Sequence, residues 1–282
     1  MATREQARRG LAIYFTVVVV VSAALEWWII THGGLTGPAG GLVLPLMYTP
    51  ALASVVARIA GHEGMRDISF RWGGVVGTRA SISAWLLPVA VGLAAYGVGW
   101  ATGLVGFAAP VQGGLKSIAN PAVRLLATIP LALTIGTLVS CVSAFGEELG
   151  WRGYMVPRLV EAEVRAPDVV SGLIWCAWHV PLILWGGYAV GKFPALSVLL
   201  FVLTILPVAL LYFRWRMASG SIWPTVIAHG TWNVVIQAVF DTYARGEGAA
   251  IWVGESGVLT AAAMWGAFVL MRRARWAGTV AP

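Results

Sequence analysis

The sequence predicts an all-α membrane protein, a bundle of about eight transmembrane helices, and two observations carry this prediction. The 282 residues are 59% hydrophobic and only 11% charged, a composition outside the range of soluble domains. The apolar residues are gathered in runs of about 20, the length that crosses a hydrocarbon core about 30 Å thick as a helix. Strands of a membrane barrel would be about half as long and would alternate in polarity, so a helical bundle is predicted.

The first apolar run, residues 11–30, follows the basic residues Arg4, Arg8 and Arg9. A basic start before an apolar run is typical of a signal peptide, but this run is too long and no small-residue cleavage site closes it before Glu26. We therefore predict a retained first helix. Seven further runs follow, at residues 42–60, 80–105, 122–145, 169–187, 195–213, 221–240 and 251–271. We expect residues 1–282 to form a single membrane-embedded domain.

The basic residues predict the orientation of this bundle. With eight spans and a cytoplasmic N-terminus, only Lys116, Arg124, Lys192 and Arg245 of the 19 basic residues fall on the outer side. Cytoplasmic loops carry the excess of Lys and Arg in membrane proteins, so both termini are predicted to be cytoplasmic. In a bacterial host the membrane would be the plasma membrane. The net charge of +7 is spread over span ends rather than gathered in one patch, which argues against nucleic acid as a partner.

Ionisable residues inside a span are costly and mark candidate functional sites. One of them, Glu26, lies beside Trp27 and Trp28 near the outer end of the first span, where we expect its carboxylate to snorkel to the interface. The candidates inside the predicted spans or at their ends are Glu26, Glu147, Glu148, Arg152, His179 and His229, while Glu255 lies at a span edge.

Residues 145–152 read F-G-E-E-L-G-W-R at the cytoplasmic end of the fourth span. On a helix Glu148 and Arg152 share a face and can pair, whereas Glu147 is rotated by about 100° away from that pair. Desolvation and a neighbouring acid would make Glu147 suitable as a general base. The alternative is a cytoplasmic loop in which all three side chains are solvated.

Two further spans carry polar side chains of catalytic type. His179 follows Trp175 by four residues in the fifth span, and His229 precedes Asn233 by four in the seventh. An imidazole and an amide on one helix face can donate two hydrogen bonds toward one point, as stabilisation of an oxyanion requires. Packing of His179 among aromatic residues and interhelical bonding by His229 and Asn233 are the structural alternatives.

The predicted topology places these three groups at one depth. The fourth span enters the cytoplasm at Glu147, while the fifth and seventh leave it, so His179 and His229 would lie about 10 to 15 Å below the cytoplasmic face at a helical rise of about 1.5 Å per residue. This placement requires the apolar helix to end just after Glu147. The coincidence of depth favours a shared site over three unrelated polar residues.

With these motifs the sequence resembles the CAAX protease and bacteriocin-processing enzyme (CPBP, or Abi) family of intramembrane proteases, which includes the type II prenyl-protein endopeptidases. Its signature is E-E-x-x-x-R, then F-x-x-x-H, then H-x-x-x-N or H-x-x-x-B, and here it falls on Glu147, Glu148 and Arg152, on His179, and on His229 with Asn233. The resemblance covers a catalytic core at about residues 120–240. Trp175 stands where the family has phenylalanine, which affects the shape of the pocket.

The resemblance implies a hydrolase that cleaves a peptide bond of a membrane-associated or prenylated protein. Glu147 and His179 would activate a water molecule, His229 and Asn233 would stabilise the oxyanion, and Glu148 with Arg152 would hold the site together. The family is often labelled metalloprotease, and Glu147, His179 and His229 could supply three ligands to a catalytic zinc. No H-E-x-x-H motif is present. A directly activated water is slightly favoured, and zinc stays open.

The implied partners are a peptide or protein substrate, prenylated or not, and membrane lipid. Bacteriocin maturation, self-immunity and processing of a membrane signalling protein all fit a bacterial host. The main alternative is a non-catalytic membrane scaffold or bacteriocin-immunity protein of the same fold, although each motif residue is present. A transporter is a weaker alternative, because the broken midplane helices and half-to-half symmetry of many transporters are not evident.

Overall fold

The computed structural model describes residues 3–111 and 114–273. In these ranges the chain is mainly helical, with one short antiparallel pairing of β1 (Gly106–Phe107) and β2 (Ala244–Arg245). The predicted all-α class is confirmed. Of the basic residues that predicted a cytoplasmic C-terminus, Arg275 lies outside the described residues.

The helices alternate with short loops along the chain. The N-terminal half contains α1 (Arg4–Thr31), α2 (Val43–Met47), α3 (Thr49–Ala60), α4 (Gly74–Ala101), α5 (Pro121–Leu131) and α6 (Thr137–Gly150). The C-terminal half contains α7 (Val156–Glu161), α8 (Pro167–Pro181), α9 (Pro194–Ser219), α10 (Trp223–Trp232), α11 (Asp241–Tyr243), α12 (Ala249–Trp252) and α13 (Val258–Met271).

Seven further helical segments are of other types. Three are single 3₁₀ turns, η1 (Gly34–Thr36), η2 (Gly40–Leu42) and η3 (Arg66–Ile68). Four are π-helical and continue α-helices without a break, namely η4 (Ala132–Gly136), η5 (Trp151–Met155), η6 (Leu182–Gly186) and η7 (Asn233–Phe240). Pro130 and Pro181 come just before η4 and η6. Because proline lacks an N–H and disrupts the α-helical ladder, these local changes of helix type are expected beside it.

Six helical stretches in the described part of the chain are long and apolar enough to cross a membrane, and they coincide with the first six predicted spans. The seventh predicted span is the continuous helix of α10, η7 and α11, whose hydropathy is lowered by His229, Asn233 and Gln237. The eighth is α13, which has 14 residues. The protein is an integral membrane protein, and the number of eight spans stays a prediction.

The fourth predicted span is part of a much longer helix. Segments α5 to α7 form one stretch of 41 residues, Pro121–Glu161, which at about 1.5 Å per residue is about twice as long as a hydrocarbon core is thick. Its first half carries large apolar side chains on the outer surface, among them Leu126, Ile135, Leu138 and Val139. Such side chains are suited to contact with lipid.

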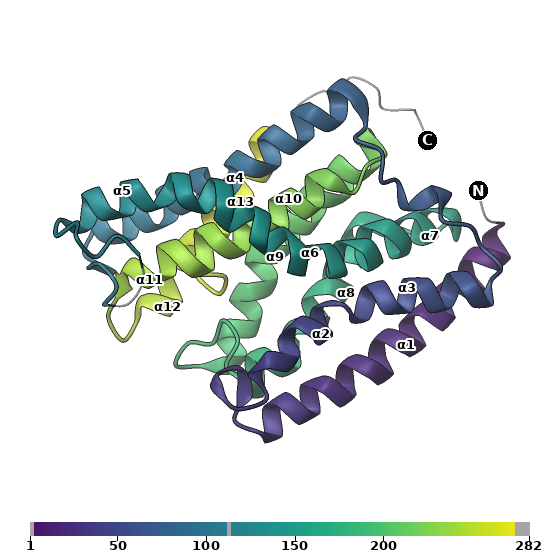
Figure 1. The fold of residues 1–282 in the computed structure, drawn as a ribbon, viewed down its shortest axis with the longest axis horizontal. Helices are drawn as coiled ribbons and strands as arrows, with labels where there is room; N and C mark the ends of the chain where they lie inside the picture. The colour runs from purple at the N-terminus through teal and green to yellow at the C-terminus, as the bar shows by residue number, and fades with distance from the viewer. Residues whose placement is uncertain (1–2, 112–113, 274–282) are drawn as a thin grey trace.

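Two of the helices that carry the motifs, α6 and α10, lie next to each other, and α8 contacts the continuation of α6 at η5 and α7 (Figure 1). Helix α6 packs between α3 on one side and α10 on the other, and α8 packs on α9. Glycines permit the close contacts of α6. A Cβ atom at Gly150 would lie 2.3 Å from the backbone of Pro50 in α3, and one at Gly230 would lie 2.9 Å from the backbone of Cys141 in α6. Because these two positions have no side chain, α6 can lie close to both α3 and α10.

A cluster of charged residues links the loop before α4 to this bundle. Asp67 is bonded to Arg58 and lies 2.7 Å from Arg158, whose guanidinium also contacts Glu63 at 2.5 Å. Arg216 of α9 donates two hydrogen bonds of 2.9 Å, one to the main-chain oxygen of Asp67 and one to that of Arg152 in η5. Burial opposes ionisation of Asp67, but the hydrogen bonds and charges of Arg58 and Arg158 outweigh it and lower the pKa of this carboxyl.

This cluster predicts a dependence of stability on pH. A pKa that is lower in the folded state than its unfolded value of about 3.9 means that stability is complete above that value and is lost as the pH falls through the folded pKa. We expect the Tm of the purified protein to fall as the pH is lowered below about 4, and Asp67→Asn to lower the Tm at pH 7 and to weaken this acid dependence.

The control is Glu247→Gln, which alters an exposed carboxylate and should follow the wild-type curve. An Asp67→Asn protein whose Tm equals that of wild type between about pH 3 and 7 would show that the cluster does not stabilise the fold.

Candidate active site

The two motif glutamates lie inside the long helix rather than at its end. The apolar helix was expected to end just after Glu147, but it continues through η5 and α7 to Glu161. Glu147, Glu148 and Arg152 have exposed fractions of 2%, 0% and 3%, which excludes the alternative of a solvated loop. Three buried ionisable groups on one helix must be paired or hydrogen-bonded to be tolerated there.

Glu148 and Arg152 form the predicted pair. Arg152 Nη1 donates to Glu148 Oε1 at 2.8 Å, and the guanidinium carbon lies 4.2 Å from the ring centre of Trp175 and 4.8 Å from that of Tyr212. His229 Nδ1 lies 3.0 Å from the same Glu148 oxygen. One carboxylate thus joins α6 to α10, while the cation rests between two aromatic faces, an arrangement that stabilises a buried guanidinium.

Glu147 is not held by that pair, since Arg152 pairs with Glu148. Its Oε2 atom accepts a hydrogen bond of 2.8 Å from the indole N–H of Trp175 and a longer one of 3.4 Å from that of Trp151. Its Oε1 atom lies 3.9 Å from His229 Nε2. The carboxylate is therefore oriented by indole donors from two helices and keeps one oxygen on the side of His229.

His179 is oriented by the same tryptophan. Its Nδ1 atom lies 2.8 Å from the main-chain oxygen of Trp175. Because a carbonyl oxygen only accepts, Nδ1 carries the proton, and in a neutral ring Nε2 is an acceptor. The ring stacks on Tyr188 at 5.5 Å between centres and contacts Phe201 at 5.0 Å. The expected packing among aromatic residues is thus present, and it leaves Nε2 as the free polar atom.

Asn233 begins the π-helical segment η7, four residues after His229. Its Oδ1 atom accepts from Gln237 Nε2 at 3.3 Å, so its amide nitrogen remains to donate elsewhere. His229 and Asn233 line a cavity of about 10 Å³, room for about one water molecule. It lies between α8, α9, the continuous helix of α10 and η7, and the turn before α13. Its wall consists of Trp175, His179, Tyr188, Phe201, Ile205, Val208, Tyr212, His229, Trp232, Asn233 and Glu255.

Each motif either reaches into a π-helical segment or is followed closely by one. Segment η5 begins three residues after Glu148, η6 begins three after His179, and η7 begins at Asn233. A π-helical turn rotates the side chains that follow it relative to an α-helix, and such turns are frequent at functional sites.

The donor atoms do not form a metal site. In residues 3–111 and 114–273, no three His, Cys, Asp or Glu side chains come together closely enough to hold a metal ion. The set of Glu147, His179 and His229 therefore does not fit the three-ligand zinc centre that the family label implies.

Three structural features of the site were not predicted. Trp175 was interpreted only as a change of pocket shape, yet its N–H, which phenylalanine lacks, binds Glu147. Glu255 was placed at a span edge and is buried in the cavity wall, where it accepts a 2.7 Å hydrogen bond from Trp232. Glu26, expected to snorkel, is buried with an exposed fraction of 6%. A carboxylate between glycines, as in G-E-S-G, was the one available signal for Glu255.

Comparison with known families supports the resemblance. Residues 129–235 match the family model described as type II CAAX prenyl endopeptidase Rce1-like, and this segment contains all three motifs. No curated protein matches the chain. The resemblance to this protease family is confirmed over the matched segment, and it supports an enzyme that acts on a peptide or protein.

Proposed function

We propose that the chain is an intramembrane endopeptidase that hydrolyses a peptide bond of a membrane-associated or prenylated protein through a water molecule activated by Glu147 and His179. One observation carries the proposal most directly. The imidazole of His179 with a free Nε2 and two donors from α10 and η7 line one cavity, and the buried carboxylate of Glu147 adjoins it through Trp175 and His229, both of which line the same cavity. Residues 120–240 would form the catalytic core of the single domain.

The activation step uses the two oriented acceptors. The water would donate one proton toward Glu147 Oε1 and the other toward His179 Nε2, and its oxygen would form a bond to the peptide carbonyl carbon as Glu147 takes the proton. Breaking of the C–N bond would return that proton from Glu147 to the leaving amine. Atoms and protons balance with no other reactant than water.

The oxyanion would be held by His229 and Asn233. The amide nitrogen of Asn233 is free to donate, and His229 would donate from Nε2 when both ring nitrogens are protonated. Glu148 beside Nδ1 and Glu147 beside Nε2 stabilise the positive charge of that ring. Loss of one such donor costs about 10²- to 10³-fold in kcat in other hydrolases.

The orientation proposed for this enzyme has both termini in the cytoplasm, and a bacterial host would carry it in its plasma membrane. The site would then open toward a peptide at the cytoplasmic leaflet, with any lipid group of the substrate lying between helices. The distribution of basic residues supports this orientation.

The first test is cleavage of a panel of quenched fluorogenic peptides, farnesylated and plain, by purified protein in detergent micelles. We expect the wild type to cut at least one peptide, and Glu147→Gln to lose about 10²- to 10⁴-fold in rate, the range for a lost general base. Glu247→Gln, at an exposed carboxylate, should retain full activity. Because the donors do not fit a zinc site, a zinc chelator should leave the wild-type rate unchanged.

Two results would contradict the proposal. Glu147→Gln cutting as fast as the wild type would remove the assigned base. A folded wild type that cuts no peptide in the panel would favour the non-catalytic scaffold or immunity protein.

The second prediction concerns Trp175. Trp175→Phe keeps an aromatic ring under Arg152 and removes the N–H that orients Glu147. Because a hydrogen bond to a charged group contributes about 1.5 to 3 kcal/mol, we expect kcat to fall about 10- to 100-fold with little change in KM. Trp178→Phe is the matched control, because its indole N–H is donated to Ser22 instead. Equal kcat values for both variants would show that the bond to Glu147 does not assist the reaction.

A further inference from the structure

Glu255 lies on a turn that re-enters the bundle. Gly254 has a φ of +85°, which favours glycine, and the N–H of Gly257 closes the turn by donating to the Gly254 oxygen at 3.2 Å. Glu255 and the next residue, Ser256, are buried, with exposed fractions of 6% and 3%. The backbone thus carries a carboxylate into the protein interior just before α13 begins.

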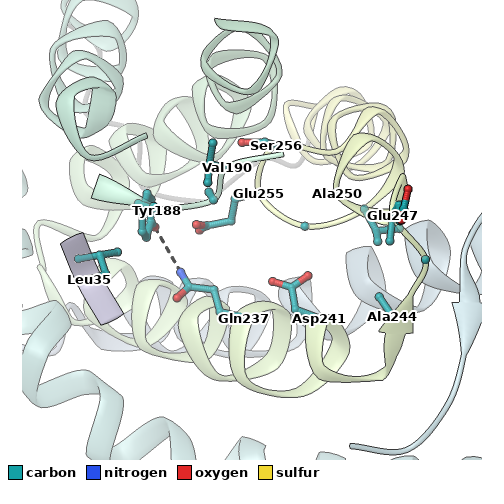
Figure 2. Close-up of a pocket in the computed structure, with 16 residues that line it drawn as sticks. Leu35, Tyr188, Val190, Gln237, Asp241, Ala244, Glu247, Ala250, Glu255 and Ser256 are labelled. Atoms are coloured by element: carbon teal, nitrogen blue, oxygen red, sulfur yellow. Dashed lines mark hydrogen bonds between the residues drawn. The ribbon is translucent and has the colours of Figure 1, made fainter. Parts of the chain in front are cut away.

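This carboxylate borders two spaces. It forms part of the wall of the catalytic cavity, with His179, His229 and Asn233, and part of the wall of a larger neighbouring pocket that contains Gln237 and Asp241. Tyr188 is shared by both walls in the same way. Figure 2 shows Tyr188, Glu255 and Gln237 pointing toward one another across the larger pocket.

Glu255 is hydrogen-bonded to one aromatic residue that adjoins the catalytic groups, Trp232, and faces a second, Tyr188. Its Oε1 atom accepts the indole N–H of Trp232 at 2.7 Å, and Trp232 directly precedes Asn233. The Tyr188 side chain points toward the same carboxylate (Figure 2), and Gln237 Nε2 donates to the Tyr188 hydroxyl at 3.4 Å. The Tyr188 ring in turn stacks on His179, with 27° between the planes.

We propose that Glu255 is a positioning residue, an inference that rests on the proposed function. Its carboxylate holds the Tyr188 ring against His179 and the Trp232 indole beside Asn233. It acts from outside the three motifs and from a different part of the chain. The imidazole of His179 has only one hydrogen bond to the protein among the described residues, from Nδ1 to the Trp175 oxygen. The flanking rings limit rotation of the His179 imidazole about that hydrogen bond. If Tyr188 were displaced, Nε2 would no longer be held in the direction of the water molecule.

The kinetic test compares Glu255→Ala and Glu255→Gln with Glu247→Gln, a carboxylate change in the same larger pocket. Small displacements of a reacting group cost up to about 10²-fold in rate, so we expect Glu255→Ala to lower kcat by about that factor with KM within about twofold of wild type. Glu255→Gln keeps an acceptor oxygen, so its kcat should be about tenfold higher than that of Glu255→Ala. Glu247→Gln should match wild type.

A spectroscopic test does not depend on activity. The chain contains four histidines, His32, His62, His179 and His229, so a protein labelled with ¹³C at histidine Cε1 gives four assignable signals. We expect the His179 signal to move in Glu255→Ala toward its position in Tyr188→Leu, where the stacked ring is absent. The signals of His32 and His62, which lie in loops, should stay in place.

Failure of the two proposals can be told apart. If wild type cuts no peptide but the His179 signal moves as described, the endopeptidase is wrong while the positioning by Glu255 holds. If the His179 signal in both Glu255 variants coincides with that of wild type, or if kcat is unchanged in Glu255→Ala, the inference is overturned. Glu255→Gln covers the case in which the alanine variant does not fold.

Discussion

The structure of the site depends on one buried charge cluster, in which Glu148 receives Arg152 from its own helix and His229 from α10. An isolated charge in this interior would be costly, because neither water nor lipid solvates it there. Pairing removes that cost only if all partners are held at hydrogen-bonding distance. The cluster therefore fixes the rotation of α6, and the same rotation turns Glu147 toward the indole of Trp175.

Packing and chemistry are linked through this arrangement. Gly150 and Gly230 let α6 approach α3 and α10 closely enough for Glu148 to reach His229. Trp175 then connects three parts of the site, since its ring covers Arg152, its N–H binds Glu147 and its main-chain oxygen binds the His179 ring. In the proposed enzyme, one aromatic residue would orient both groups that activate water.

Helical periodicity explains how much of this could be predicted from the sequence. The fold class and the first six apolar helices follow from the length of the apolar runs. The pairing of Glu148 with Arg152 follows from their spacing of four residues along one helix. Contacts between helices do not, because spacing carries no information on how neighbouring helices are rotated. For that reason the indole bond of Trp175 and the buried turn at Glu255 were missed. The helix was also expected to end near Glu147, since hydropathy falls there although the backbone continues.

The most direct test of this account is a double-mutant cycle on the charge cluster, measured as the free energy of unfolding in detergent. Glu148→Gln leaves the buried Arg152 without its carboxylate, and Arg152→Met leaves Glu148 with His229 alone. We expect each to destabilise the protein by about 3 to 5 kcal/mol. The double variant should be at least about 2 kcal/mol more stable than the sum of the two losses predicts, because neither charge is then left alone. Additive losses would show that the pair does not hold the site together, and the central claim would be wrong.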